Sequence, residues 1–111
     1  MKGGHKGKYH ITASYTADGA KGLLKDGGTK RLQVVRELLK GVGATLEAGY
    51  FALGEQDVYL IVDAPDHASV TAIALATNAS GAVRVNTTVL LTPQEVDAAT
   101  KKSVKYTPPG G

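Results

Sequence analysis

The order in which two hydrophobic periodicities follow one another constrains the fold of this chain more than any other feature. Four stretches are rich in β-branched and aromatic residues or alternate apolar with polar ones, as β-strands do. These predicted strands are residues 8–16, 44–53, 57–63 and 82–91. Between them, residues 29–43 and 65–81 repeat apolar side chains three and four apart, which is the spacing of an amphipathic helix. The predicted order is therefore strand, helix, strand, strand, helix, strand.

That order predicts an α+β fold of the ferredoxin-like, or split βαβ, arrangement: a βαββαβ chain with a four-stranded antiparallel sheet and two helices on one face. The other face of the sheet is left uncovered in a single copy. Both faces carry bulk, because Leu60 and Val62 alternate with Tyr59 and Ile61. A single-layer sheet with two apolar faces indicates that the chain pairs with itself, as a homodimer or a higher oligomer.

Capping residues and glycines mark where the helices begin and end. We expect Thr29 to cap the first helix, Gly41 to end it, and Asp66 to cap the second. Thr92, followed by a proline, predicts a short last helix, since proline fits the first helical turn. The glycine-rich residues 17–28 are expected to form a short turn or a loose helical piece rather than a long helix.

The length of 111 residues and the hydrophobic content of 42% suit one domain. We expect that domain to span residues 8–103, between flexible tails at residues 1–7 and 104–111. The absence of cysteine excludes disulfides, thiolate metal sites and cysteine nucleophiles. No apolar run is long enough for a transmembrane helix or a signal peptide, so we expect a soluble, cytoplasmic protein with no membrane partner.

The formal net charge of +3 is unevenly distributed, with residues 1–40 basic and residues 41–100 acidic. A basic first half can suit nucleic acid. Here, however, the basic residues stand at helical spacing among acidic ones, with few aromatic side chains nearby for stacking on bases. We therefore interpret them as a solvated helix surface and expect no nucleic-acid partner.

Three segments together resemble the GYD-domain family of small bacterial and archaeal proteins. They are YFALGEQDVYLIVDAPD, SYTADGAKGLLKDGGTKR and GAVRVNTTVLLTPQEVDA, and with their spacing they extend the resemblance over residues 8–99. The resemblance implies that two ferredoxin-like units pack sheet to sheet as a dimeric α/β barrel. It implies no established biochemical role.

The family's Gly-Glu-Tyr-Asp motif is matched here by Gly54, Glu55 and Asp57, while Gln56 stands where the tyrosine would be. A structural role suits this motif, because it lies in the predicted hairpin between two strands. We expect Gly54 to adopt a positive φ there and Asp57 to accept backbone N–H bonds within the turn. Any role that depends on the tyrosine hydroxyl is in doubt in this chain.

His10 is the one histidine that the pattern places on the polar face of a strand, beside Thr12 and Ser14. If that face lines the barrel of a dimer, His10 can act as a general base or as a ligand donor. The alternative is an exposed or hydrogen-bonded histidine with a structural role. The chain has no HxH or HxxxH spacing, so we expect no metal site, and no motif indicates a cofactor.

Tyr50 and Tyr59 are candidates for stacking on a planar ligand, although we favour core or interface packing, where aromatic residues are common. Arg84 shares a predicted strand face with Asn86 and requires a counter-charge. An anionic ligand would supply one, and so would a salt bridge to Glu47, within the chain or across an interface.

Three hypotheses follow for the function. The first is a small-ligand-binding module whose pocket between sheet and helices uses His10, Tyr50, Tyr59, Arg84 and Asn86. The second is a small cofactor-independent enzyme of the barrel monooxygenase or isomerase kind with His10 as its base. The third is a structural or regulatory oligomer that binds no ligand.

Overall fold

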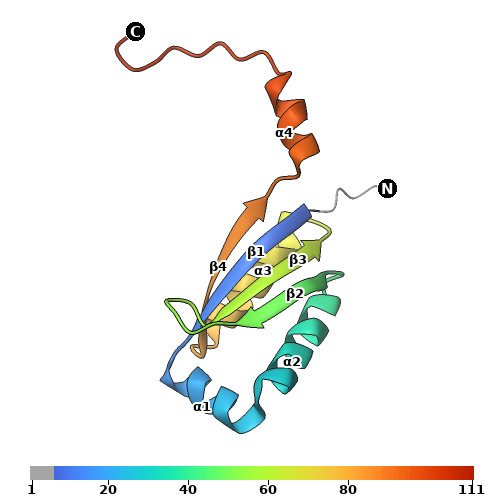
Figure 1. Ribbon diagram of the computed structural model, residues 1–111, viewed down its shortest axis with the longest axis vertical. Coiled ribbons are helices and arrows are strands. Elements are labelled where there is room, and N and C mark those ends of the chain that lie inside the picture. The colour runs from blue at the N-terminus through green and yellow to red at the C-terminus, as the bar shows by residue number, and fades with distance from the viewer. Residues whose placement is uncertain (1–6) are drawn as a thin grey trace.

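The computed structural model describes residues 7–111 and contains a four-stranded antiparallel sheet (Figure 1). Its strands are β1 (Gly7–Tyr15), β2 (Thr45–Phe51), β3 (Val58–Ala64) and β4 (Val83–Leu90), in the spatial order β2-β3-β1-β4. The helices are α1 (Ala17–Asp26), α2 (Gly28–Lys40), α3 (His67–Ala79) and α4 (Pro93–Thr100). The predicted α+β, ferredoxin-like fold class is confirmed.

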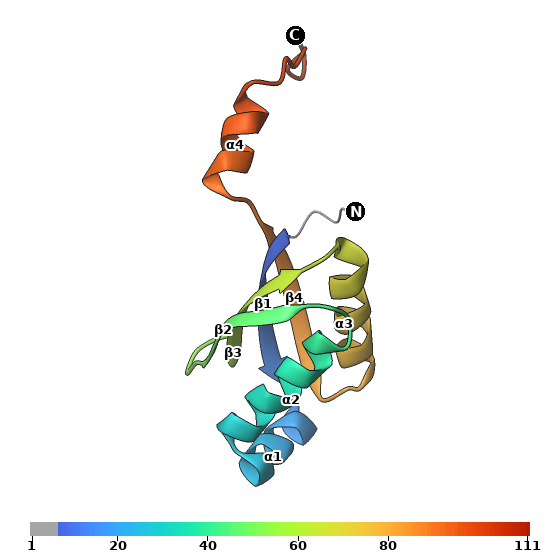
Figure 2. The ribbon, with the colours of Figure 1, turned by 90° about the vertical axis from the view of Figure 1, so that its right-hand side faces the viewer.

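Helices α2 and α3 lie on one face of the sheet (Figure 2). The side chains of that face form the core together with these helices. β1 contributes Tyr9, Ile11 and Ala13 to this core, and β3 contributes every second residue from Val58 to Ala64. The intervening side chains of both strands, His10 and Tyr59 among them, lie on the opposite face. No helix of residues 7–111 covers that face. The sheet therefore has one buried face and one open face.

Helices α3 and α4 begin where the sequence predicts. The Asp66 carboxylate accepts a hydrogen bond of 2.8 Å from the Ser69 backbone N–H, and this contact lowers the pKa of Asp66. At α4, the Thr92 hydroxyl accepts from the Glu95 N–H while the Glu95 carboxylate accepts from the Thr92 N–H. This reciprocal capping box satisfies two backbone donors at once.

The prediction of a turn or loose piece over residues 17–28 is wrong in extent, because α1 is a regular helix of ten residues. The Thr16 side chain caps it by accepting from the Gly19 N–H. Gly19 is buried against the backbone of Ala82, and a methyl group there would lie 2.0 Å from the Ala82 carbonyl oxygen. Glycine at this position thus serves close packing of the helix on the chain before β4.

The expectation that Thr29 caps α2 is also wrong, because α2 already begins at Gly28. The cap is Gly27, whose φ of 83° lets a single residue end α1 and start α2. Its N–H donates to the Leu23 carbonyl, which closes α1. At the other end of α2, Gly41 is the capping residue, as predicted.

The predicted hairpin between β2 and β3 is confirmed by their antiparallel register. A bulge between Leu46 and Ala48 shifts this register by one residue. Gly54 is not among the glycines with positive φ, so the expectation for its backbone is wrong. The loop from residue 52 to 57 is long enough to reverse the chain without a left-handed residue at that position.

Helix α4 stands away from the sheet and continues the line of β4 (Figures 1 and 2). It contains no buried residue, and residues 101–111 beyond it form neither helix nor strand. The predicted N-terminal tail, residues 1–7, lies outside the described residues except for Gly7, which begins β1. Within residues 7–111, no helix combines the length and apolar character needed to cross a membrane.

The two glycines inside α1 provide a matched test of its packing. Gly19→Ala should lower the free energy of unfolding by about 1–3 kcal/mol, because the new methyl group collides with backbone atoms of Ala82. Gly22→Ala should raise it by roughly 0.5–1 kcal/mol, because nothing lies within 4 Å of the added carbon and alanine favours the helix. Urea unfolding measures both, and equal effects would contradict the packing role of Gly19.

Candidate functional site

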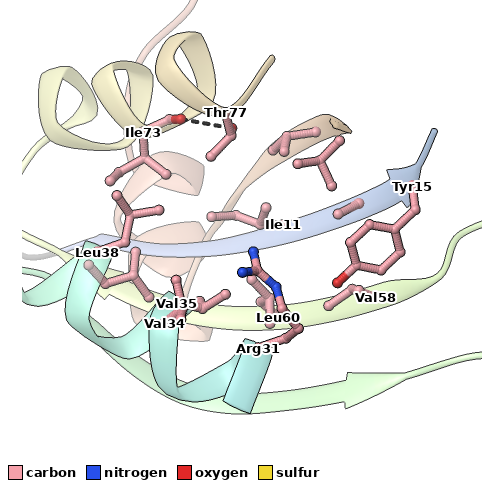
Figure 3. Close-up of a pocket in the computed structure, with 14 residues that line it drawn as sticks. Ile11, Tyr15, Arg31, Val34, Val35, Leu38, Val58, Leu60, Ile73 and Thr77 are labelled. Carbon is pink, nitrogen blue, oxygen red and sulfur yellow. Dashed lines mark hydrogen bonds between the residues drawn. The ribbon is translucent and has the colours of Figure 1, made fainter. Parts of the chain in front are cut away.

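A cavity of about 100 Å³ lies between the buried face of the sheet and helices α2 and α3 (Figure 3). Ile11 and Leu60 line it from the sheet, Val35 and Leu38 from α2, and Ile73 from α3. Carbon atoms make up most of its wall. A cavity of this kind holds apolar groups in preference to water, because water needs two or more polar partners.

Three polar side chains also line the cavity, and two of them have hydrogen-bonding groups to spare. The Thr77 hydroxyl donates to the Ile73 carbonyl at 2.8 Å within its own helix. The guanidinium of Arg31 and the hydroxyl of Tyr15 form no side-chain hydrogen bond among residues 7–111. The nearest acidic group to Arg31 is Asp26, with Nη1 and Oδ2 3.8 Å apart. The cavity is thus apolar inside and has uncommitted donors on its wall.

The predicted site residues do not line this cavity. His10, Tyr50, Tyr59, Arg84 and Asn86 all lie on the open face of the sheet, opposite α2 and α3. The prediction that they share a pocket between sheet and helices is therefore wrong in its location. The physical reason is the alternation of side chains along a strand, since the neighbours of these residues in the chain are the ones that face the helices.

The open face brings some of the predicted residues together. The rings of His10 and Tyr59 stack with centroids 5.7 Å apart and an angle of 26° between their planes. Tyr50 lies directly across from Tyr59 in the β2–β3 register. Arg84 and Asn86 lie on the edge strand β4, beyond β1, and both are exposed. Of these residues, His10 and Tyr59 make a ring contact, while Asn86 is separated from Tyr59 by Thr12 of β1 in the strand register.

The suggested salt bridge between Arg84 and Glu47 does not exist within the chain. Arg84 is on β4 and Glu47 on β2, which are the two opposite edges of the sheet. Glu47 pairs instead with Lys8, which also contacts Asp63 at 2.9 Å. The hydrogen bonds to these two carboxylates raise the pKa of Lys8.

The Gly-Glu-Gln-Asp motif ties the hairpin to the end of β1. The Asp57 carboxylate accepts a hydrogen bond of 2.8 Å from the Tyr15 N–H, and the Asp57 N–H donates to the Ala13 carbonyl at 2.9 Å. Gln56 accepts from the Ser14 hydroxyl at 3.0 Å. Within its own turn, Asp57 accepts from the Ala52 N–H through its backbone carbonyl at 2.8 Å, while its carboxylate accepts from β1 and not from the turn. Because the Tyr15 ring lines the cavity, this motif also positions one wall of it.

Sequence reasoning missed two features. The first is a contact of 2.7 Å between the Tyr9 hydroxyl and Nδ1 of His67, whose rings meet edge to face. Burial, and then the charge of Asp66, raise the pKa of Tyr9. The second is Arg31 in the cavity wall; its spacing of four and seven residues from Val35 and Leu38 is the signal that places it on their face of the helix.

Metal-ligating residues do not cluster in the part of the chain that the structure describes. Within residues 7–111, no group of three or more histidine, cysteine, aspartate or glutamate residues lies close enough together to hold a metal ion. Among the described residues, the His10 side chain makes only the ring contact with Tyr59. The candidate site with the clearest geometry is therefore the apolar cavity with Arg31 and Tyr15.

The motif's structural role can be tested by removing one carboxylate at a time. Asp57→Ala should lower the free energy of unfolding by about 1–3 kcal/mol, because it leaves the Tyr15 N–H without its acceptor. Glu55→Ala, at the exposed neighbouring position of the same motif, should change it by less than about 0.5 kcal/mol. Chemical denaturation measures the free energy of unfolding of both variants. Comparable decreases in the two would contradict a stabilising role for the contact between Asp57 and Tyr15.

Comparison with known proteins identifies the family of this chain. The model of the GYD domain matches residues 9–100, which is most of the chain. Searches of the curated proteins and of the solved structures give no match. The match covers all four strands of the sheet and the hairpin motif, apart from the first residues of β1. The chain belongs to the GYD-domain family.

Proposed function

We propose that this protein binds a small ligand in the cavity between its sheet and its two covering helices, and that it works as a homo-oligomer. The observation that carries the first part is the carbon-lined cavity of about 100 Å³ with Arg31 and Tyr15 in its wall. Well-packed cores leave few voids larger than a water molecule. A void of several water volumes in so small a domain is thus a feature that a ligand would use.

The size of the cavity limits the ligand. A cavity of about 150 Å³ is enough to hold benzene, and this one is smaller. A branched apolar group of four or five carbon atoms is therefore the largest body that we expect to enter it without movement of the walls. Each buried methylene contributes about 0.8 kcal/mol, so such ligands should bind in the millimolar range.

A neutral branched probe tests this proposal. 3-Methyl-1-butanol, titrated into uniformly labelled protein and followed by NMR, should shift the methyl signals of Ile11, Val35 and Ile73 in a saturable way. Val35→Phe should abolish these shifts, because the ring occupies the space. Val89→Phe makes the same substitution at a half-exposed site that does not line the cavity, and it should bind as the unchanged protein does.

The thermal midpoint of each variant shows whether it still folds. Saturable shifts that persist in a folded Val35→Phe protein would overturn the proposal, as would an unchanged protein that shows no saturable shifts.

Native mass spectrometry of gently purified protein tests for a bound ligand directly, since a retained small mass identifies the natural ligand. His10 lies outside this cavity, so an enzyme that used it as a base would require a second site between two sheets.

The open face of the sheet supports the second part of the proposal, a homodimer that packs sheet to sheet. Tyr50 is 72% exposed on this face and Tyr59 38%. Aromatic side chains of this kind are enriched at protein interfaces. The face also carries Arg84, which has no ion-pair partner among residues 7–111. A carboxylate from a second copy would supply that partner.

Two tyrosines of nearly equal exposure provide a matched test of this interface. Tyr50→Glu should convert the dimer to a monomer, because it places a charge in an apolar contact. Tyr106→Glu changes a tyrosine that is 73% exposed beyond α4, and it should leave the dimer intact. Sedimentation velocity measures the masses. An unchanged protein that is monomeric, or a dimer that only Tyr106→Glu dissociates, would contradict sheet-to-sheet packing.

A further inference from the structure

We infer that the cavity selects small branched carboxylates, whose apolar body enters the cavity while the Arg31 guanidinium binds the carboxylate. This inference rests on the proposed function and names the chemical class of its ligand. It is carried by the position of one cation on the wall of a cavity that is otherwise almost entirely carbon.

The guanidinium of Arg31 has unused hydrogen-bond donors. A guanidinium carries five N–H donors in a planar fork that matches the two oxygens of a carboxylate. The contact to Asp26, at 3.8 Å, is longer than a hydrogen bond. Lys30 approaches the same carboxylate at 3.7 Å, so the charge of Asp26 is shared between two cations. An additional anion beside Arg31 therefore meets a cation that is only partly neutralised.

The hydroxyl of Tyr15 supplies a second donor in the same cavity (Figure 3). Thr77 is committed to the Ile73 carbonyl, so Tyr15 and Arg31 are the two lining side chains with free donors. Among residues 7–111, no acidic side chain lines the cavity, and Asp26, the acidic neighbour of Arg31, lies outside its wall. This donor set favours an anionic oxygen over an ammonium group, which Arg31 would repel.

The exposure of these residues sets the direction of the ligand. The Arg31 side chain is 32% exposed, which places it at the solvent side of the cavity. Ile11 and Leu60, at 3% and 7%, are deep in the core. A ligand must thus present its charge outward and its carbon body inward. The volume of about 100 Å³ limits that body to a short branched chain.

The test compares two probes of the same shape at pH 7. 3-Methylbutanoate carries a carboxylate, and 3-methyl-1-butanol carries a neutral hydroxyl on the same branched body. We expect the unchanged protein to bind the carboxylate at least about tenfold more tightly, since hydrogen bonds to charged groups exceed neutral ones. NMR titration gives both dissociation constants in one sample series.

Substitutions then assign the preference to Arg31. Arg31→Met should remove the tenfold preference and leave the affinity for the alcohol nearly unchanged, because the apolar walls remain. Arg31→Lys keeps the charge without the planar fork and should retain an intermediate preference. Arg36→Met removes an exposed arginine of the same helix that does not line the cavity, and it should behave as the unchanged protein. Thermal melting confirms that each variant is folded.

The outcomes separate this inference from the proposed function. Binding of neither probe overturns both. Equal affinity for the two probes, or a carboxylate preference that survives in Arg31→Met, overturns the carboxylate selectivity while the apolar binding site stands. Loss of the preference in both Arg31→Met and Arg36→Met would indicate a general effect of net charge, and it would also overturn the role of Arg31.

Discussion

The sheet is organised around β1, which pairs with two neighbouring strands at once. β1 lies between β3 and β4, so its backbone is hydrogen-bonded on both sides and its side chains divide between the two faces of the sheet. Tyr9, Ile11 and Ala13 are buried beneath the helices. His10, which lies between two of them in the chain, stacks on Tyr59 on the open face. One strand therefore contributes to both the candidate ligand cavity and the candidate dimer interface.

The hairpin motif likewise has two roles, because it stabilises the fold and positions a residue that lines the cavity. Asp57 holds the backbone of Tyr15 at the end of β1, and the ring of Tyr15 lines the cavity. Gln56, which stands where the family has a tyrosine, accepts a hydrogen bond from Ser14 on the adjacent stretch of the same strand. A contact that stabilises the fold thus also sets the geometry of the cavity. Gly27, which ends α1 and starts α2, also affects the cavity. It places Arg31 one turn into α2 and close to Asp26.

Much of the fold could be predicted because hydrophobic periodicity is a local property. The order of strands and helices along the chain, the caps Asp66 and Thr92 and the end of α2 at Gly41 follow from neighbours in the sequence. Helix α1 was underestimated, because glycine is unfavourable in an isolated helix. Gly19 is there to allow contact with Ala82, which is remote in sequence, and no local pattern reports such a contact.

Which residues share a face can be predicted from local spacing: alternation groups His10 with Thr12 and Ser14, and helical spacing groups Arg31 with Val35 and Leu38. Which face of the sheet the helices cover cannot be predicted in this way. It depends on how α2 and α3 pack on the sheet. Because they pack on the other face, the residues predicted to line the pocket lie outside it: His10, Tyr50, Tyr59, Arg84 and Asn86. The same packing brings Arg31 and Tyr15 to one cavity from two separate elements, because burial of apolar surface is decided by the packing of the whole chain and not by any one segment.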